Sequence, residues 1–404
     1  MRLSEELQWR GFVNQMTYAD ITELDQAPIA FYWGVDPSAD SMTIGNFAAA
    51  MMVCHFIDAG HKATLLVGGA TGMIGDPDGK KDERNLQTLE QIAHNKAAIA
   101  EQYKRVFAGK SFEIVDNYDW FKNINYLDFL RLVGKNVPLS QMLGRDFVQS
   151  RIGEDGSGIS YAEFSYALIQ GYDFLHLNRE HGVTLQLCGA DQWGNSIAGV
   201  DLIRRIEGNE AHVYSTPLVI NKATGKKFGK SEEGAVWLDE KKTSVYKFYQ
   251  FWLNADDEGT ADYAKIFTLL GRDEIAEMEK QIAENPRERA AQKRLAQEVT
   301  KIVHGEARLA SVEKVTEVLF GGAHVAELSH EELAMLAAEI PTVAKGSTIV
   351  ESLVASGVAS SNGDARRLIE GGAVSLNGEK IAQDETLDSA SLLKKGKNNF
   401  ILVR

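Results

Sequence analysis

The chain has 404 residues, of which 44% are hydrophobic and 25% charged, and this length predicts two or three domains rather than a single core. Charged residues interrupt the apolar runs before about 18 residues, so we expect no membrane span, no secretion and a cytoplasmic protein. The two cysteines, Cys54 and Cys188, exclude a disulfide framework and a cysteine zinc site, and we expect no protein-bound metal.

The formal net charge of −14 argues against a polyanionic partner, because affinity for nucleic acid depends on neutralising phosphates. The charge is unevenly distributed, however. Residues 345–404 carry 8 Lys and Arg against 7 Asp and Glu, so the acidity is confined to residues 1–344. A nucleic-acid partner for the C-terminal part therefore stays open.

The first strand predicted in the N-terminal part of the chain covers residues 29–35. Turn-forming residues follow over 36–42, and a helix begins at Gly45. A further strand over 63–67 completes a βαβ unit, which predicts a parallel sheet with ligands at the carboxyl ends of its strands. A helix N-terminus in that position offers free backbone N–H groups and favours phosphate, so a nucleotide site is the leading hypothesis.

Further elements follow in alternation. We expect strands over 112–115 and 183–187, and helices over 86–107, 127–133, 141–152 and 164–177. The last of these helices carries a polar stripe on one face, with Tyr166, Gln170 and Asp173 three or four residues apart among apolar neighbours. Polar groups on a buried face need partners. They either bond to neighbouring helices or bind a ligand.

The C-terminal half is predicted to be helical from Ser244, with helices over 246–253, 263–270, 273–283 and 287–303 and shorter ones over 306–338. Residues 341–347 are predicted to be a linker. Two short helices over 349–355 and 361–370 precede a hairpin turned by Asn377 and Gly378.

Two short segments make the sequence resemble class I aminoacyl-tRNA synthetases. Residues 43–46, Thr-Ile-Gly-Asn, resemble a diverged His-Ile-Gly-His element, and residues 227–231, Lys-Phe-Gly-Lys-Ser, resemble the Lys-Met-Ser-Lys-Ser loop. The segments 34–41, 67–77, 164–173 and 190–195 are together similar to the bacterial tyrosyl-tRNA synthetase family, in family order over nearly the whole chain. The tail resembles an S4-type RNA-binding module.

The resemblance implies a Rossmann-like α/β catalytic domain over 1–232, a helical domain on the anticodon side over 233–340, the linker 341–347 and an S4-like α+β domain over 348–404. It implies a tyrosine–tRNA ligase that uses ATP and Mg²⁺, forms tyrosyl-adenylate and charges tRNA(Tyr), as a homodimer.

The same resemblance assigns roles to individual residues. Catalytic phosphate and ribose contacts are expected from Thr43, Asn46, Lys80, Arg84, Lys227, Lys230 and Ser231. Tyrosine is expected to bind to Tyr32, Asp76, Tyr166, Gln170, Asp173 and Gln192. The ATP site is expected to include Gly34, Asp36, Ser38, Gly45, Gly189, Asp191 and Lys230, and the RNA contacts Arg366 and Arg367.

The sequence departs from the family pattern at four positions, three of which are among the residues just named. Thr43 and Asn46 replace both histidines of the first element; Asn46 keeps an NH₂ donor, whereas Thr43 can offer only a hydroxyl. Losing one transition-state donor typically costs roughly 3 kcal/mol. Ser38 stands where the family often has Thr, and Trp33 where it often has Cys, so we expect the ribose side of the site to differ in shape.

Two other functions stay open from the sequence. An enzyme of the same fold that activates tryptophan would also need an acceptor, for its indole N–H, so Asp173 alone does not exclude it. The replaced histidines and the S4-like tail would also fit a non-catalytic RNA-binding relative. ATP–pyrophosphate exchange with tyrosine, with tryptophan and without amino acid separates the three.

Overall fold

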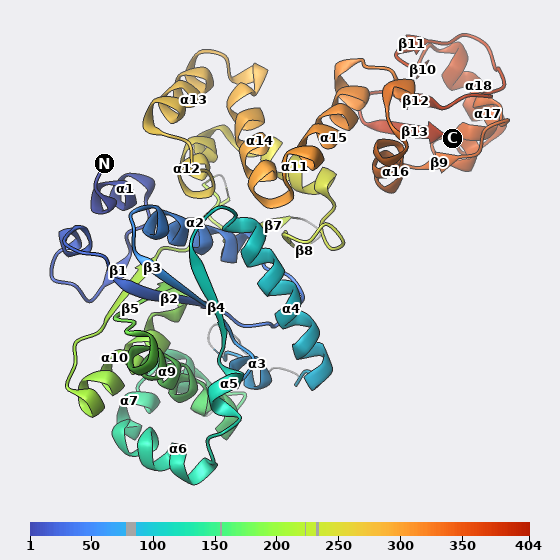
Figure 1. The fold of residues 1–404 in the computed structure, drawn as a ribbon. Helices are drawn as coiled ribbons and strands as arrows, with labels where there is room; N and C mark the ends of the chain where they lie inside the picture. Colours follow the sequence, from blue (N-terminus) through green and yellow to red (C-terminus); the bar gives the residue numbers. More distant parts are fainter. Residues whose placement is uncertain (78–85, 154–155, 223, 232–233) are drawn as a thin grey trace. The chain divides into compact units, whose positions relative to one another are not determined.

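The structure is a computed structural model that describes residues 1–77, 86–153, 156–222, 224–231 and 234–404. The chain divides into two compact units, the first formed by residues 1–243 and 251–303 and the second by residues 244–250 and 304–404 (Figure 1). None of the described helices is both long enough and apolar enough to span a membrane.

The first unit is built around a six-stranded sheet with the order β1-β6-β5-β2-β3-β4. All neighbouring strands are parallel except the β1–β6 pair at the edge. Its strands are β1 (Gln15–Met16), β2 (Ala30–Val35), β3 (Lys62–Val67), β4 (Phe112–Asp116), β5 (Leu185–Gly189) and β6 (His212–Thr216). The strands predicted over 29–35, 63–67, 112–115 and 183–187 are confirmed as β2 to β5, whereas β1 and β6 were not expected.

The strand order places the topological switch point between β2 and β5. From β2 the chain proceeds outward through β3 and β4, and it then returns to the other side of β2 to form β5 and β6. The connections from these two neighbouring strands therefore leave in opposite directions, which opens a crevice beyond their carboxyl ends where ligands of such sheets bind.

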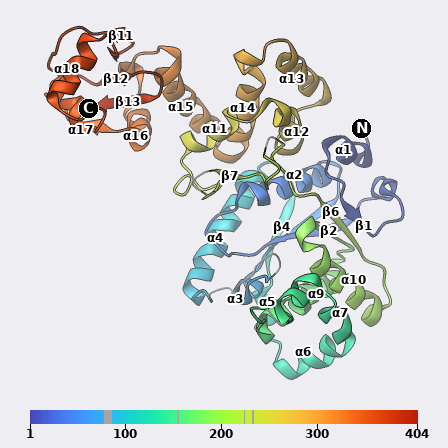
Figure 2. The ribbon, with the colours of Figure 1, turned by 180° about the vertical axis from the view of Figure 1, so that it is seen from behind.

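The helices of this unit are α1 (Leu3–Arg10), α2 (Ile44–Asp58), α3 (Thr71–Ile74), α4 (Leu89–Val106), α5 (Tyr118–Phe121), α6 (Tyr126–Leu132), α7 (Leu139–Leu143), α8 (Asp146–Ile152), α9 (Tyr161–His181), α10 (Trp193–Glu207), and then α11 (Val245–Leu253), α12 (Asp257–Phe267), α13 (Arg272–Glu284) and α14 (Ala290–His304), where α11 begins and α14 ends within the second unit. The sheet is covered on both faces, by α2 and α4 on one and by α9 on the other, whereas α11 to α14 lie together beyond α2 (Figures 1 and 2). The helix predicted over 141–152 is wrong as a single element, because Gly144 ends α7 and α8 begins two residues later.

Alternate side chains of β2 reach opposite faces of the sheet, as the pleat requires. Phe31 packs on Phe56 of α2, and Trp33 packs on Tyr103 of α4, with ring centroids 5.5 Å apart in both pairs. Tyr32 points the other way and packs on Phe174 of α9 at 5.3 Å. Tyr32 of the central strand therefore lies on the face of the sheet that is covered by the polar helix α9.

The second unit contains a five-stranded sheet with the order β11-β10-β12-β13-β9. Its elements are α15 (Glu306–Thr316), α16 (His330–Glu339), β9 (Thr342–Val343), α17 (Ile349–Ala355), α18 (Asn362–Glu370), β10 (Val374–Leu376), β11 (Glu379–Lys380), β12 (Ser391–Lys395) and β13 (Asn399–Val403). The predicted hairpin turn is confirmed between β10 and β11, with φ of +49° at Asn377 and +91° at Gly378, as a type I′ turn requires.

Both faces of this small sheet are buried. Leu393, Ile401 and Val403 pack against α17 and α18, whereas Leu392, Phe400 and Leu402 pack on an apolar cluster that includes Val315 of α15 and Leu336 of α16. Within the segment predicted to be a linker, Thr342 and Val343 pair with β13. Residues 304–404 therefore belong to one compact unit with an apolar cluster on each face of its sheet, while the predicted domain boundaries stay predictions.

Candidate active site

A cluster of carboxylates and hydroxyls lies at the carboxyl ends of the central strands. Asp36 follows β2 directly, and Asp173 belongs to the polar stripe of α9. Tyr166 of the same stripe donates its hydroxyl to Asp36 Oδ2 at 2.7 Å. Gly68 follows β3 at this point, where a Cβ atom would lie 2.2 Å from both Asp36 Oδ1 and Thr71 Oγ1. Only glycine leaves room for this packing.

Asp173 is almost completely buried and is held by two donors. Asn117 Nδ2 donates to Oδ2 at 3.0 Å, and Trp120 Nε1 donates to Oδ1 at 2.9 Å. Burial raises the pKa of the Asp173 carboxyl well above its ordinary value, and these two hydrogen bonds oppose the shift. Asn117 also donates to Thr71 Oγ1 at 3.0 Å, so its side chain links α3 and α9 through one amide.

Two buried polar atoms beside this cluster have no hydrogen-bond partner among the described residues. They are the Tyr32 hydroxyl and Gln170 Oε1. Burial raises the pKa of the Tyr32 phenol, and the nearby Asp173 charge raises it further. A buried polar group without a partner costs free energy, so these atoms mark a place where a polar ligand would be stabilised.

Asp76 lies in a second group with the residues that follow β5. Gln192 Nε2 donates to Asp76 Oδ2, and Asn195 Nδ2 lies 3.4 Å from Asp76 Oδ1. Arg145 Nη1 donates to Asn195 Oδ1 at 2.6 Å. Asp191 lies in the same turn, where a Cβ atom on Gly189 would come within 2.6 Å of its Oδ1.

The two synthetase-like segments lie side by side. Residues 227–231 lead into the hairpin of β7 (Lys230–Ser231) and β8 (Gly234–Ala235). Directly after this hairpin, the Val236 carbonyl accepts a hydrogen bond from the Ile44 N–H at 3.1 Å. Gly229 has φ of +93°, and a Cβ atom there would lie 3.3 Å from Ile44 Cβ. Glycine at 229 thus allows the loop to lie against the start of α2 next to Gly45.

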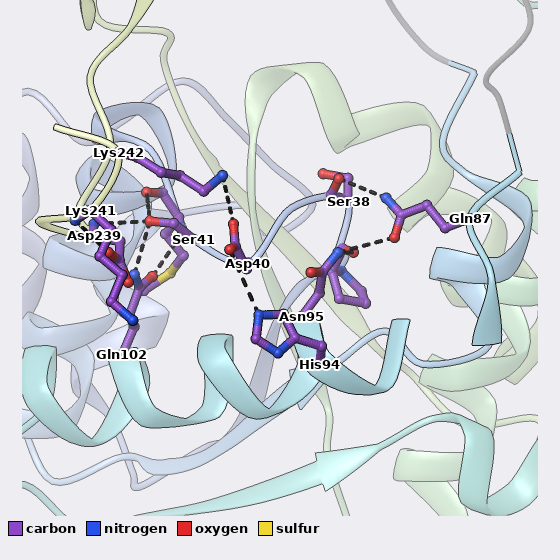
Figure 3. Close-up of polar contacts among 12 residues, drawn as sticks. Ser38, Asp40, Ser41, Gln87, His94, Asn95, Gln102, Asp239, Lys241 and Lys242 are labelled. Carbon is purple, nitrogen blue, oxygen red and sulfur yellow. Dashed lines mark hydrogen bonds and ion pairs between the residues drawn. The ribbon is translucent and has the colours of Figure 1, made fainter. Parts of the chain in front are cut away.

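Side chains on two sides of the segment between β2 and α2 hold it by hydrogen bonds and an ion pair (Figure 3). Gln87, which precedes α4, donates Nε2 to the Ser38 carbonyl at 2.7 Å. Lys242, which follows the hairpin, forms an ion pair with Asp40 at 2.7 Å and lowers the pKa of that carboxyl. Asn95 of α4 adds a bond to the Pro37 carbonyl. The backbone at Ser38 is thereby fixed relative to α4.

The structure brings most of the expected site residues to the carboxyl edge of the sheet, on β2, α2 and α9 and around the end of β5. Gly34 lies in β2, with Leu66 close to the place of a Cβ atom. Lys227 is exposed beside Ile220. The expected contacts of Lys80 and Arg84, and of the Lys230 and Ser231 side chains, lie outside what the structure describes. Arg366 and Arg367 are exposed on α18 of the second unit.

Several side chains of this site were not predicted from the sequence. Asn117 could have been found, since it comes directly after β4, where polar residues of parallel sheets meet a ligand. Thr71 and Asn195 lie in segments noted for their family resemblance but had no assigned role. Trp120 and Arg145 carry no local signal, because only tertiary contacts give them their partners.

Comparisons with known proteins agree with this geometry. Residues 24–321 match the family model of tRNA synthetases class I (W and Y), and residues 332–404 match that of the tyrosine–tRNA ligase SYY-like C-terminal domain. The tyrosine–tRNA ligase of Levilactobacillus brevis is 44% identical over 420 residues, which span 100% of this chain and 99% of that protein. Tyrosine–tRNA ligase 2 of Bacillus cereus ATCC 10987 is 43% identical over 100% of both chains.

Among solved structures, a C-terminally truncated mitochondrial tyrosyl-tRNA synthetase from Aspergillus nidulans superimposes with a TM-score of 0.71 at 29% identity. The match covers 79% of this chain and 94% of that one. Family models and full-length relatives thus agree on both parts of the sequence. The chain therefore belongs to the class I tRNA synthetases, within the family of the tyrosine–tRNA ligases.

Proposed function

We propose that this chain activates L-tyrosine with ATP and transfers it to the 3′-terminal adenosine of tRNA(Tyr). In the first step a tyrosine carboxylate oxygen attacks the α-phosphorus of ATP, the bond to the β-phosphate oxygen breaks, and tyrosyl-adenylate and pyrophosphate form. In the second step a ribose hydroxyl of the tRNA attacks the acyl carbon and AMP leaves. The observation that carries the proposal is the buried Tyr32 hydroxyl next to Asp173, which has no hydrogen-bond partner among the described residues.

The arrangement around Asp173 fits a phenol. A substrate phenol could donate to the carboxylate and accept from Tyr32, which would satisfy both groups at once. Phenylalanine would leave the buried Tyr32 hydroxyl unpaired and would offer no donor to Asp173, which is how a binding site can demand one hydroxyl; discrimination of ~10⁵ is the value known for tyrosyl-tRNA synthetases. Tryptophan offers a single N–H donor and no acceptor, so it would leave Tyr32 without a partner.

The carboxylates fit the other end of the substrate. Asp76 and the Tyr166–Asp36 pair supply acceptors for an α-ammonium group, and Gln170 Oε1 is a further buried acceptor without a partner among the described residues. Gln192 Nε2 donates to Asp76 in this structure. From the same position it could donate to the carboxylate of a bound tyrosine. We assign tyrosine binding to the six residues Tyr32, Asp76, Tyr166, Gln170, Asp173 and Gln192.

For ATP, we assign adenine and ribose contacts to Gly34, Asp36, Ser38, Gly45, Gly189 and Asp191, and phosphate contacts to Thr43, Asn46, Lys80, Arg84, Lys227, Lys230 and Ser231. Such transfers need positioning and preorganised positive charge rather than a protein nucleophile. Mg²⁺ would neutralise the triphosphate. The described residues hold no group of three His, Cys, Asp or Glu side chains placed to bind a metal ion, so we expect Mg²⁺ to enter with ATP.

We further propose that the chain acts in the cytoplasm as a homodimer and that the second unit binds tRNA(Tyr), partly through Arg366 and Arg367. Large apolar side chains are exposed around α6 to α9 of the first unit, and a second copy would cover them. They are Tyr126, Leu127, Leu139, Ile152 and Tyr161.

ATP–pyrophosphate exchange with purified protein tests the activity. We expect exchange that depends on tyrosine and is absent with tryptophan, with phenylalanine or without amino acid. Exchange with tryptophan would favour the tryptophan-activating alternative, and no exchange by folded protein that binds tRNA would favour the RNA-binding one. Asp173→Ala is expected to lose the preference for tyrosine over phenylalanine, or to lose activity, while it remains folded.

A further inference from the structure

The two residues that replace the family's histidines are bonded to each other. Thr43 is the N-cap of α2 and Asn46 is its third helical residue. The Thr43 backbone N–H and the Thr43 hydroxyl both donate to Asn46 Oδ1, each over 3.0 Å. The two changes in this element are therefore coupled rather than independent.

These contacts determine which way the Asn46 amide faces. Nitrogen and oxygen of an amide are similar in shape, and their assignment rests on the partners. A backbone N–H can only donate, so the Asn46 atom that faces the Thr43 backbone has to be the oxygen. Both lone pairs of Oδ1 are then used, and the Nδ2 hydrogens are turned away from Thr43.

The same contacts limit what Thr43 can do. A threonine hydroxyl has one hydrogen to donate. While that hydrogen is shared with Asn46 Oδ1, Oγ1 offers only lone pairs, which a phosphate oxygen would repel. The Thr43 hydroxyl thus cannot donate to a phosphate oxygen and to Asn46 Oδ1 at the same time, although the Thr43 backbone N–H can still hold Oδ1.

We propose that Thr43 is a positioning residue, which orients the Asn46 amide so that Nδ2 is the donor presented to the nucleotide, and that Thr43 itself does not contact the substrate. This inference rests on the proposed function of the site. It reassigns the Thr43 hydroxyl from a direct ligand contact to an indirect role and makes Asn46 the catalytic donor of the pair.

The backbone at the start of α2 is held in place, so the Asn46 side chain is the part of this element that could change its conformation. Ile44 N–H is bonded to the Val236 carbonyl, and Thr43 forms a bridge with Trp237, so the start of α2 is held on the side of the hairpin. A free Asn side chain would lose rotamer entropy on binding ATP. The bond from Thr43 restricts it before ATP arrives, which is the advantage of a preorganised donor.

A double-mutant cycle on kcat for pyrophosphate exchange tests the assignment. Removing the donor with Asn46→Ala should lower kcat by roughly 10²-fold. Removing only the hydroxyl with the isosteric Thr43→Val should lower it by about 10-fold, because the amide is then less well placed. In the Asn46→Ala background the same Thr43→Val change should have less than about a twofold effect, because nothing is left to position.

Additive effects would overturn the proposal, because they would mean that the Thr43 hydroxyl contacts the nucleotide independently of Asn46. An unchanged kcat in Thr43→Val would overturn it as well. Thr43→Ser should restore most of the rate, since serine keeps the hydroxyl, and KM for tyrosine should change little in the whole series.

Two further variants separate positioning from simple helix capping. Asn46→Asp keeps an oxygen facing Thr43 and places a carboxylate near the helix N-terminus, so it should melt no lower than wild type yet lose activity. Retained activity would contradict a donor role for Nδ2. Thr348→Val removes a capping threonine from α17 and should lower the melting temperature without changing kcat.

A crystal structure of free Thr43→Val gives a readout besides activity. With only the backbone N–H of residue 43 left to hold Oδ1, the Asn46 side chain should be displaced or less ordered than in wild type, and an unchanged, equally ordered side chain would overturn the proposal. If wild-type protein showed no tyrosine-dependent exchange, the proposed function would fail, whereas additivity in an active enzyme would refute only the role of Thr43.

Discussion

The chemistry of the site depends on single atoms whose partners are present or missing. Asp173 has its two donors, Asn117 and Trp120, and Tyr32 has none among the described residues. A buried polar atom without a partner weakens the free protein and strengthens the complex that supplies one. At the scale of residues, removing the Tyr32 hydroxyl should therefore not lower the stability of the free protein, but it should lower the specificity for tyrosine.

Tyr32→Phe should leave the melting temperature unchanged or slightly higher, because the lost hydroxyl has no partner in the part of the chain that the structure describes. The preference for tyrosine over phenylalanine in pyrophosphate exchange should fall by about 10-fold. Tyr103→Phe is the matched control: the buried Tyr103 hydroxyl donates to the Leu66 carbonyl at 3.0 Å, so this variant should lose stability and keep the preference. The opposite pattern would show that Tyr32 does not meet the substrate phenol.

Asp173 also predicts a dependence of stability on pH. Its pKa in the folded chain lies above the ordinary value of 3.8, so at intermediate pH the folded chain keeps a proton that the unfolded chain has released. The contribution of Asp173 to the free energy of unfolding is therefore fully present below about pH 4 and declines as the pH rises. Urea unfolding of wild type and Asp173→Ala at several pH values should show the difference, wild type minus variant, falling with pH; a rising difference would contradict the sign.

Among the elements, the hairpin after residue 227 is preceded by one buried aromatic side chain, Phe228. Phe228 is 7% exposed and stacks on Tyr263 of α12 at 4.2 Å, with Trp252 and Phe267 around it. The loop that carries the expected phosphate contacts is thus held at its start by an aromatic cluster. Its position should depend on the packing of the helices that follow it.

Phe228→Ala should cost about 3 kcal/mol of stability, because it leaves a cavity in this cluster. We also expect KM for ATP to rise at least about 10-fold, because the loop loses its anchor. Phe228→Leu should recover much of both. Phe56→Ala removes a fully buried ring between α2 and the sheet, and it should reduce stability without the change in KM. Equal effects of the two alanine variants on KM would argue against an anchoring role.

In the whole molecule, the acidic excess and the two arginines expected to contact RNA lie in different parts of the chain. Residues 1–344 carry all of the acidic excess, and Arg366 and Arg367 are exposed on α18. Removing residues 346–404 is a poor test of RNA binding, since it would uncover the cluster around Val315 and Leu336. Point substitutions leave that core intact.

Arg366→Ala combined with Arg367→Ala should raise KM for tRNA in the charging reaction by roughly 10-fold and reduce the salt dependence of binding by about two counter-ions. Tyrosine-dependent pyrophosphate exchange should stay at the wild-type rate. Lys104→Ala with Arg105→Ala, an exposed basic pair on α4, serves as the control for lost charge. If both double variants weakened charging equally, the effect would reflect overall charge and not contacts of α18.

The sequence determined the features that depend on neighbours along the chain. The central strands, the start of α2, the polar stripe on α9 and the turn at Asn377 and Gly378 were all predicted, because periodicity and turn chemistry act over a few residues. Family resemblance then supplied roles for residues that the local pattern only marked as unusual.

Tertiary structure decided what depends on partners distant in sequence. The strand β6 forms by pairing with β1 and β5, and β13 pairs with the distant β9, while Gly144 divides a helix whose apolar pattern continues across it. The donors of Asp173 come from the end of β4 and from α5, more than 50 residues away. Hydrogen bonds of this kind are set by strand order and register, which local propensity does not encode, so the partners of each site residue became known only from the folded chain.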